Sequence, residues 1–252
     1  MGPPDTWDKM RHWLSQLSSD IGVKPKAIVL ISGHWEEFDF TINNGANPPL
    51  LYDYSGFPPE TYRIQYPAPR SPELAERIHE LFSHAGIASR YDSQRGYDHG
   101  VFIPLKVIYP KADIRIVQVS LKSGLDPASH IAAGQALAPL RQEGVLIVGS
   151  GMSYHNMRGF FSGGPIPDSD RFDEWLTMAV SSPERNEKLR IWQAAPAARQ
   201  AHPREEHLIP LLVASGAAEG ENGRKIFSDR VMGAIVSAFQ FGNSAGSQPL
   251  VT

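Results

Sequence analysis

The sequence contains no cysteine, which excludes disulfides and thiolate ligands for a metal. A metal bound by this chain must therefore use imidazole and oxygen donors. The formal net charge is -3 and no run of Lys and Arg is present, which argues against nucleic acid or an anionic membrane as the main partner. No apolar run approaches the ~20 residues of a membrane span, and residues 1–17 are too charged for a signal peptide. We expect a cytoplasmic protein that binds a small molecule.

The 252 residues, of which 41% are hydrophobic, can bury a sizeable core. We expect one domain over residues 1–252, with a flexible polar tail at 242–252. Apolar runs at 27–32, 113–121 and 144–149 read as buried strands, and helical patterns separate them. This alternation predicts a single-domain three-layer α/β/α fold with a central, mostly parallel, mixed sheet. The other expected elements are helices at 6–18, 72–86, 128–141, 170–180, 184–193 and from Pro203, and strands at 87–91 and 233–241.

Three histidines stand at the ends of different elements. His34 follows the strand predicted at 27–32, His155 follows the strand predicted at 144–149 after a Gly/Ser turn, and His207 lies in HPREEHLIPL. Ligands of open α/β sheets bind beyond the carboxyl ends of the strands. Single histidines on separate elements can meet there only in the folded chain, so we predict one shared metal site.

His202 lies five residues before His207, about 140° away around a helix, so both side chains should not face one metal. We expect His207 to point inward and His202 to cap the helix or line the edge of the site. Glu206 is most simply an acidic residue at a helix start, although it could also contact a metal ligand.

A long segment at 43–72 is rich in Pro, Gly and Tyr and reads as a loop. Loops of this length in compact domains tend to be functional. Its aromatic residues could form a wall against a flat ring, or they could simply anchor the loop. These residues are Tyr52, Tyr54, Phe57, Tyr62 and Tyr66.

Five segments, in order, carry a resemblance to a known family. They are ISGHW, YDYSGFPPETYRIQYPAPRSPELA, RGYDHGVFIPLKVIYPKADIRIVQVSL, LIVGSGMSYHNMR and HPREEHLIPLL, and they lie between about residues 25 and 241. The chain resembles the extradiol ring-opening dioxygenases of the protocatechuate 4,5-dioxygenase catalytic-subunit superfamily (class III), especially their DOPA-dioxygenase-like branch. The resemblance implies a non-haem Fe(II) enzyme that cleaves a catechol-type ring beside the diol with O2. Relatives can also carry Zn(II), and many are homodimers.

The resemblance also implies roles for single residues. His34 and His207 match metal-binding histidines, and His155 matches a position described both as a metal ligand and as the catalytic base. His99 in GYDHG matches a histidine that assists the substrate or oxygen. We expect Tyr54 and His202 to contact the substrate.

The family pattern includes a first strand that ends in a His-Gly motif and supplies a further metal ligand, and this sequence starts downstream of that motif. Two functions therefore stay open. One is the extradiol dioxygenase, and the alternative is a catalytically silent member that binds zinc or an aromatic acid, or serves as a partner subunit. A zinc hydrolase using the same histidines is a third possibility, which oxygen consumption distinguishes.

Overall fold

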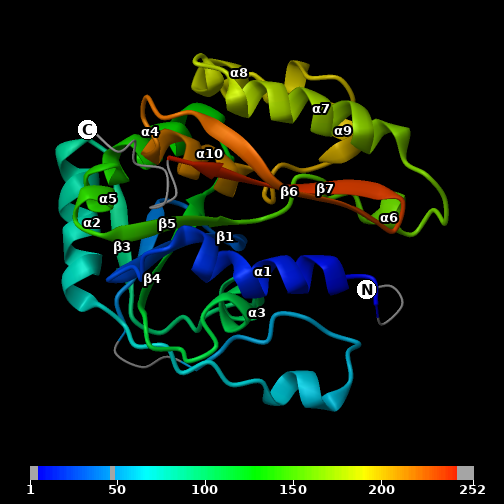
Figure 1. Ribbon diagram of the computed structural model, residues 1–252. Helices are drawn as coiled ribbons and strands as arrows, with labels where there is room; N and C mark the ends of the chain where they lie inside the picture. Colours follow the sequence, from blue (N-terminus) through cyan, green and yellow to red (C-terminus); the bar gives the residue numbers. More distant parts are fainter. Residues whose placement is uncertain (1–4, 46–48, 243–252) are drawn as a thin grey trace, which may run out of the picture.

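The computed structural model describes residues 5–45 and 49–242. A five-stranded sheet at its centre has the order β3-β2-β4-β1-β5, and a separate hairpin pairs β6 with β7 (Figure 1). The strands are β1 (Ala27–Glu37), β2 (Phe40–Asn43), β3 (Ser89–Asp92), β4 (Arg115–Lys122), β5 (Val145–Ser150), β6 (Gly223–Val231) and β7 (Ala234–Phe241). β1 pairs in parallel with β4 and β5, and β2 pairs in parallel with β3 and antiparallel with β4. The predicted mixed, mostly parallel α/β sheet is confirmed.

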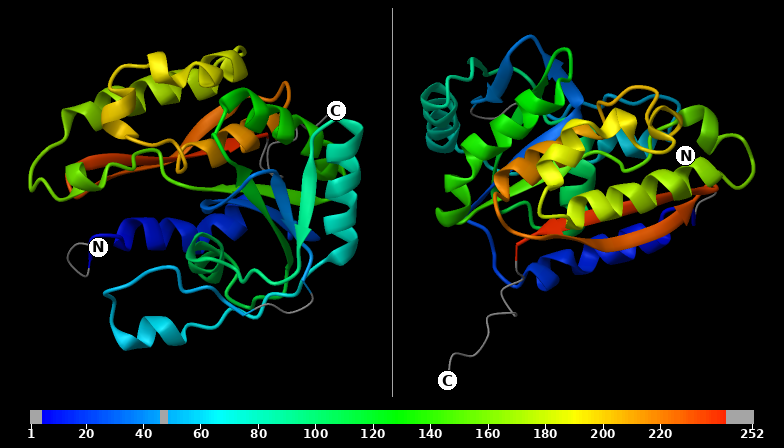
Figure 2. Two further views of the ribbon diagram at one scale, coloured as in Figure 1. Left: turned by 180° about the vertical axis from the view of Figure 1, so that it is seen from behind. Right: turned by 90° about the horizontal axis from the view of Figure 1, so that it is seen from above.

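Helices cover both faces of this sheet. In the views of Figures 1 and 2, α1 and α3 lie on one side, and α7, α8 and α10 lie on the other. The helices are α1 (Asp8–Ile21), α2 (Pro72–His84), α3 (His99–Ile108), α4 (Pro127–Leu137), α5 (Pro139–Gln142), α6 (Met157–Phe160), α7 (Pro167–Ser181), α8 (Arg185–Arg190), α9 (Ala198–Ala201) and α10 (Ile209–Ala217), with 3-10 turns η1 (Pro59–Arg63) and η2 (Trp192–Ala194). None of the helices in residues 5–45 and 49–242 has the length and apolarity needed to cross a membrane.

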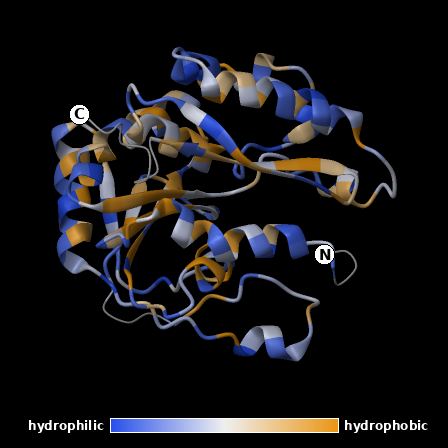
Figure 3. Ribbon diagram, viewed as in Figure 1, coloured by the Kyte–Doolittle hydropathy of each residue, from blue (hydrophilic) through white to orange (hydrophobic). Residues whose placement is uncertain are grey.

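The inner strand β1 contributes residues to a hydrophobic core on each face of the sheet. Val29 and Ile31 pack with α2, α4 and α10 on one side, whereas Ile28 and Leu30 pack with α3 on the other. A strand that is buried on both faces favours apolar residues at successive positions, which is why 27–31 is a continuous apolar run. Figure 3 shows apolar residues along the strands of the central sheet and hydrophilic residues on the outermost turns of α7 and α8.

Several elements differ from the sequence-based expectations. β1 continues to Glu37 and so contains His34, with a register shift against β4 between Ile31 and Glu36. The strands β2 and β6 and the helix α3 were not predicted. The helix expected from Pro203 was wrong, since residues 203–208 form turns and α10 begins at Ile209. The polar tail expected at 242–252 lies outside the described residues, apart from Gly242.

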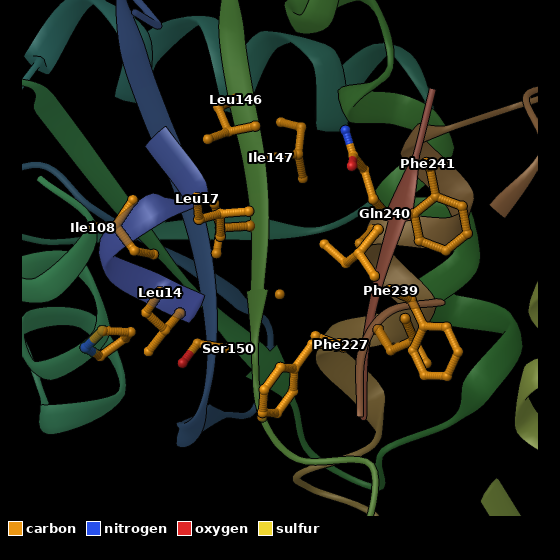
Figure 4. A pocket seen from close by; sticks show the side chains of 18 of the residues that line it. Leu14, Leu17, Ile108, Leu146, Ile147, Ser150, Phe227, Phe239, Gln240 and Phe241 are labelled. Carbon is orange, nitrogen blue, oxygen red and sulfur yellow. The ribbon is translucent and has the colours of Figure 1, made fainter. Parts of the chain in front are cut away.

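An apolar cavity of about 520 Å³ lies between α1, β5 and the hairpin β6-β7 (Figure 4). Leu14 and Leu17 of α1 line it on one side of β5, and Phe227 and Phe239 of the hairpin line it on the other. Among the strands of the described chain, β5 pairs only with β1. The cavity reaches His207 at the carboxyl end of β5.

The crossing of α4 and α10 depends on two glycines. A Cβ on Gly134 would lie 2.1 Å from the carbonyl oxygen of Val213, and one on Gly216 would lie 2.2 Å from that of Ile131. Real Cβ atoms do not approach backbone so closely, so any side chain here must push the helices apart.

Gly134→Ala is therefore expected to lower the free energy of unfolding by about 1–3 kcal/mol, as overpacked cores do. Urea titrations followed by circular dichroism would measure the change. Gly220→Ala is the matched control, because nothing lies within 4 Å of its Cβ position. Equal stabilities of the two variants would contradict the tight crossing.

Candidate active site

Four histidines from four segments meet at the carboxyl ends of β1 and β5. The ring centroids of His34 and His99 are 3.9 Å apart, and those of His34 and His207 are 4.8 Å apart. His155 stacks on His207 at 3.4 Å with an interplanar angle of 20°. The structure thus brings His34, His155 and His207 together, as the sequence predicted, and places His99 beside them.

Asp53 lies beside the first pair of imidazoles and is hydrogen-bonded to one of them. Its Oδ1 lies 2.8 Å from Nδ1 of His99, and its Oδ2 lies 3.8 Å from Nδ1 of His34. The same Oδ1 accepts a hydrogen bond from the backbone N–H of His99 at 3.0 Å, so Asp53 also caps the start of α3. The sequence analysis missed this residue, whose only signal is an acidic side chain between two tyrosines of the loop.

Glu206 holds the second pair. Its Oε1 lies 3.3 Å from Nδ1 of His155 and 3.0 Å from Nδ1 of His207. Glu206 is thus a partner of both imidazoles, rather than an acidic residue at a helix start.

Nδ1 of His99, His155 and His207 is therefore bonded to a carboxylate, and Nδ1 of His34 faces Asp53 at a longer distance. Within the described part of the chain, Nε2 of these rings has no hydrogen-bond partner and is available to a metal or a substrate. A carboxylate on one ring nitrogen fixes the tautomer and the orientation of the ring, and it makes the other nitrogen a better ligand. Two groups of potential ligand atoms result, one around Asp53 and one around Glu206, each spanning no more than 4.8 Å.

Burial keeps the imidazoles of His34 and His207 neutral. It lowers the pKa of His34 to about 3, helped by repulsion from His99 and His207, and it also lowers the pKa of His207. Burial would raise the pKa of Glu206, but the hydrogen bonds with His155 and His207 outweigh it and hold that pKa well below its usual range. Neutral imidazole is the form that binds metals, so the site is ready to do so at neutral pH.

Two glycines let the segment of His207 approach the strand ends. A Cβ on Gly33 would lie 2.9 Å from the carbonyl oxygen of Glu206, and one on Gly151 would lie 2.1 Å from that of His207. The backbone N–H of Met152 donates a hydrogen bond to the same His207 oxygen at 2.9 Å. The position of His207 is therefore set by backbone contact with β1 and with the turn after β5.

The aromatic loop borders the first pair of histidines. The ring of Tyr54 meets His99 edge to face at 5.7 Å, while its hydroxyl donates a hydrogen bond to the carbonyl oxygen of Thr61 at 2.6 Å. Tyr54 thus anchors the loop and also presents its ring beside the site. Tyr66 is buried, and its hydroxyl donates to the carbonyl oxygen of Tyr109, so its contacts serve to anchor the loop.

His202 lies outside the four-histidine cluster. Its side chain is fully buried, Nε2 donates a hydrogen bond to the carbonyl oxygen of Ser153 at 3.0 Å, and the ring packs on Phe172 and Trp192. Burial lowers the pKa of His202 to about 3. Its contact with a substrate stays a prediction.

Comparisons with known proteins agree with one another. A family model described as the catalytic LigB subunit of aromatic ring-opening dioxygenase matches residues 3–240. The 4,5-DOPA dioxygenase extradiol of Beta vulgaris is 45% identical over 218 residues, covering 85% of this chain and 80% of that protein. Dioxygenase tasH of Hapsidospora irregularis is 38% identical, with 88% of this chain and 73% of that protein covered. The crystal structure of the uncharacterized protein JW3007 from Escherichia coli K12 superimposes with a TM-score of 0.76 at 32% identity, over 92% of this chain and 91% of that one.

The buried His202 predicts a pH dependence of stability. Its pKa is depressed in the folded chain and near 6.5 when unfolded, so below about pH 6.5 only the unfolded state binds the proton and stability falls as the pH drops toward 3. His202→Gln keeps a donor for the Ser153 oxygen but cannot titrate. Its fall in unfolding free energy should be shallower than that of the wild type, by up to about 1.4 kcal/mol per pH unit.

Urea unfolding at several pH values between about 6.5 and 4.5 would measure this slope. His84→Gln, at the exposed end of α2, is the control and should keep the wild-type slope. A His202→Gln variant with the wild-type slope would contradict a neutral, buried His202.

Proposed function

Since this chain belongs to the LigB family of aromatic ring-opening dioxygenases, we propose that it is a non-haem Fe(II) enzyme that opens the ring of a catechol beside its two hydroxyl groups. Its relatives are named extradiol dioxygenases, so the chain is an oxidoreductase of this class. The observation that carries the proposed metal and substrate is the cluster of four imidazoles, three of which bond a carboxylate through Nδ1 and so turn Nε2 away from it.

The donor set fits a divalent first-row metal. Imidazoles with carboxylate partners are the usual ligands of non-haem iron and of zinc, and the chain has no thiolate to compete. Glu206 Oε2 is also buried without a hydrogen bond among the described residues, at 3.5 Å from Nη1 of Arg204. We assign His34 and His207 to the metal, and His155 either to the metal or to the catalytic base, with Fe(II) for activity and Zn(II) as an ion the isolated protein can carry. Bound Fe(II) would supply binding positions for the catechol oxygens and O2, and would pass electrons from the catechol to O2.

The protein's own residues manage the protons. A catechol must lose two protons, and a neutral histidine can accept one at neutral pH. His155 has this capacity at Nε2, because its Nδ1 faces Glu206. On the other side of His34, His99 is oriented by Asp53 and can donate a hydrogen bond or a proton to oxygen as the O–O bond breaks.

The aromatic loop suits a flat substrate. Tyr54 stands edge-on to His99, and Tyr52 and Phe102 pack behind it. We assign the ring contact to Tyr54 and keep His202 as a more distant substrate residue. Several relatives are named 4,5-DOPA dioxygenase, so DOPA heads the panel of catechols to be tested.

Two alternatives differ in a measurable way. A catalytically silent member would bind zinc or an aromatic acid without consuming O2, and a zinc hydrolase would turn over without O2. The names of the relatives favour neither.

Anaerobic reconstitution with Fe(II), followed by oxygen uptake and visible spectra with DOPA and simpler catechols, tests the function. We expect oxygen uptake and a yellow ring-opened product with Fe(II), and neither with Zn(II). Bound Fe(II) with no oxygen uptake on any catechol would overturn the dioxygenase assignment.

His155→Gln separates the two roles of His155. As a base, its loss should lower kcat by about 10²–10⁴-fold while bound Fe(II) stays stoichiometric. His34→Gln, which removes a ligand, should lose Fe(II) itself. If His155→Gln loses Fe(II) as well, His155 acts as a ligand, and full turnover of this variant would exclude both roles.

A further inference from the structure

Asp98 is a fully buried carboxylate next to His99, and it touches none of the four imidazoles by hydrogen bond. Buried carboxylates are rare unless they are paired or hydrogen-bonded, because desolvation costs several kcal/mol. We propose that Asp98 is a positioning residue that fixes the spacing between His34 and His99. As far as turnover is concerned, this inference rests on the proposed function.

Three donors from different parts of the chain converge on the Asp98 carboxylate. Ser32 Oγ donates a hydrogen bond to Oδ1 at 2.8 Å, and Gln118 Nε2 donates one to Oδ2 at 2.5 Å. Arg95 Nη2 lies 3.4 Å from the same Oδ2. Ser32 belongs to β1 and Gln118 to β4, so one carboxylate ties two neighbouring strands to the start of α3.

The network holds the backbone of His34 on both sides. The backbone N–H of His34 donates to Ser32 Oγ at 3.2 Å, and its carbonyl oxygen accepts from Arg95 Nη2 at 3.1 Å. The guanidinium of Arg95 also lies 4.9 Å from the ring centroid of Trp35. Both backbone groups of His34 are therefore bonded to residues that themselves bond or pair with Asp98.

The same residue sets the position of His99. Asp98 is the N-cap residue of α3, and its carbonyl oxygen accepts hydrogen bonds from two backbone N–H groups of the first turn, at 2.9 and 3.1 Å. A Cβ on Gly100 would lie 2.4 Å from Ser32 Oγ and 3.0 Å from Cδ2 of His34. The first turn of α3 thus rests directly on β1, and the two imidazoles end 3.9 Å apart.

Asp53 and Asp98 act on different parts of the two histidines, the rings and the backbone. Asp53 orients the ring of His99 and faces that of His34, whereas Asp98 holds the backbones from which both rings extend. A carboxylate suits this place, because it is acceptor-only and three donors face it. Asn would keep the shape but offer one acceptor oxygen.

Asp98→Asn should disturb the fold only mildly, because Asn has the same shape and one of the donors can adapt to it. Gln118 Oε1 is buried with no hydrogen-bond partner in the described part of the chain, so a flipped amide can accept a bond from the new Asn. The main loss then falls on Arg95, whose charged partner disappears, and through it on the carbonyl oxygen of His34.

The experiment measures metal binding, which does not require turnover. Zn(II) and Co(II) titrations and the visible spectrum of the Co(II) form would be recorded for the wild type and for Asp98→Asn. We expect about 10–100-fold weaker binding and a changed Co(II) spectrum, as for other residues that orient metal ligands. Arg95→Gln removes the link to His34 without altering Asp98, and it should change both readouts in the same direction.

Asp173→Asn is the matched control. Asp173 is also buried, and it accepts hydrogen bonds from Lys225 at 2.6 Å and Ser237 at 2.5 Å, on the hairpin β6-β7. This variant should lose stability but keep the wild-type metal affinity and spectrum. Wild-type behaviour of Asp98→Asn, or equal weakening by both variants, would overturn the inference.

Failure of the proposed function would look different. A wild type that binds Co(II) through histidines but takes up no O2 with any catechol would remove the dioxygenase assignment. The contrast between Asp98→Asn and Asp173→Asn would still decide the role of Asp98.

Discussion

Two carboxylates determine how four imidazoles share one small space. Asp53 and Glu206 each face a pair of Nδ1 atoms, so the four Nε2 atoms are the ones left for chemistry. Burial lowers the pKa of His34 and His207, so the crowded rings do not repel one another as cations at neutral pH. The strand ends, the turn before α10 and the aromatic loop all contribute to holding these two carboxylates in position.

The sequence predicts the meeting of His34, His155 and His207 because a general rule applies to them. They follow or lie near the carboxyl ends of β1 and β5, which are neighbours in the sheet. No such rule applies to Asp53, since the path of a long loop depends on tertiary contacts that no local pattern encodes.

The helix α3 was not predicted because Gly100 and Pro104 are poor helix formers. Burial of this segment against the sheet favours the helix in the folded chain.

The side chains of His202 and His207 point to different places, as expected, but not because of the helix that the sequence predicted. An ideal helix from Pro203 was expected to turn the two histidines apart. The chain instead forms turns at 203–208, and His202 ends α9 while His207 precedes α10. The two side chains do separate, since His202 packs against Phe172 and Trp192 and His207 enters the four-histidine cluster. Their separation comes from the turns at 203–208 that join α9 to α10, whose path sequence spacing does not report.

The close approach of Gly33 and Gly151 to the segment of His207 bears on how such a site can evolve. Any side chain at either position would displace the backbone that carries His207, so these walls cannot be reshaped one residue at a time. Tyr54 of the aromatic loop meets the site through its ring, edge to face with His99, and its hydroxyl bonds the carbonyl oxygen of Thr61 within the same loop, so a change there leaves the backbone of His207 in place. Within this fold, new substrates would therefore be accommodated by variation of the loop, while the chemistry stays with the strand ends.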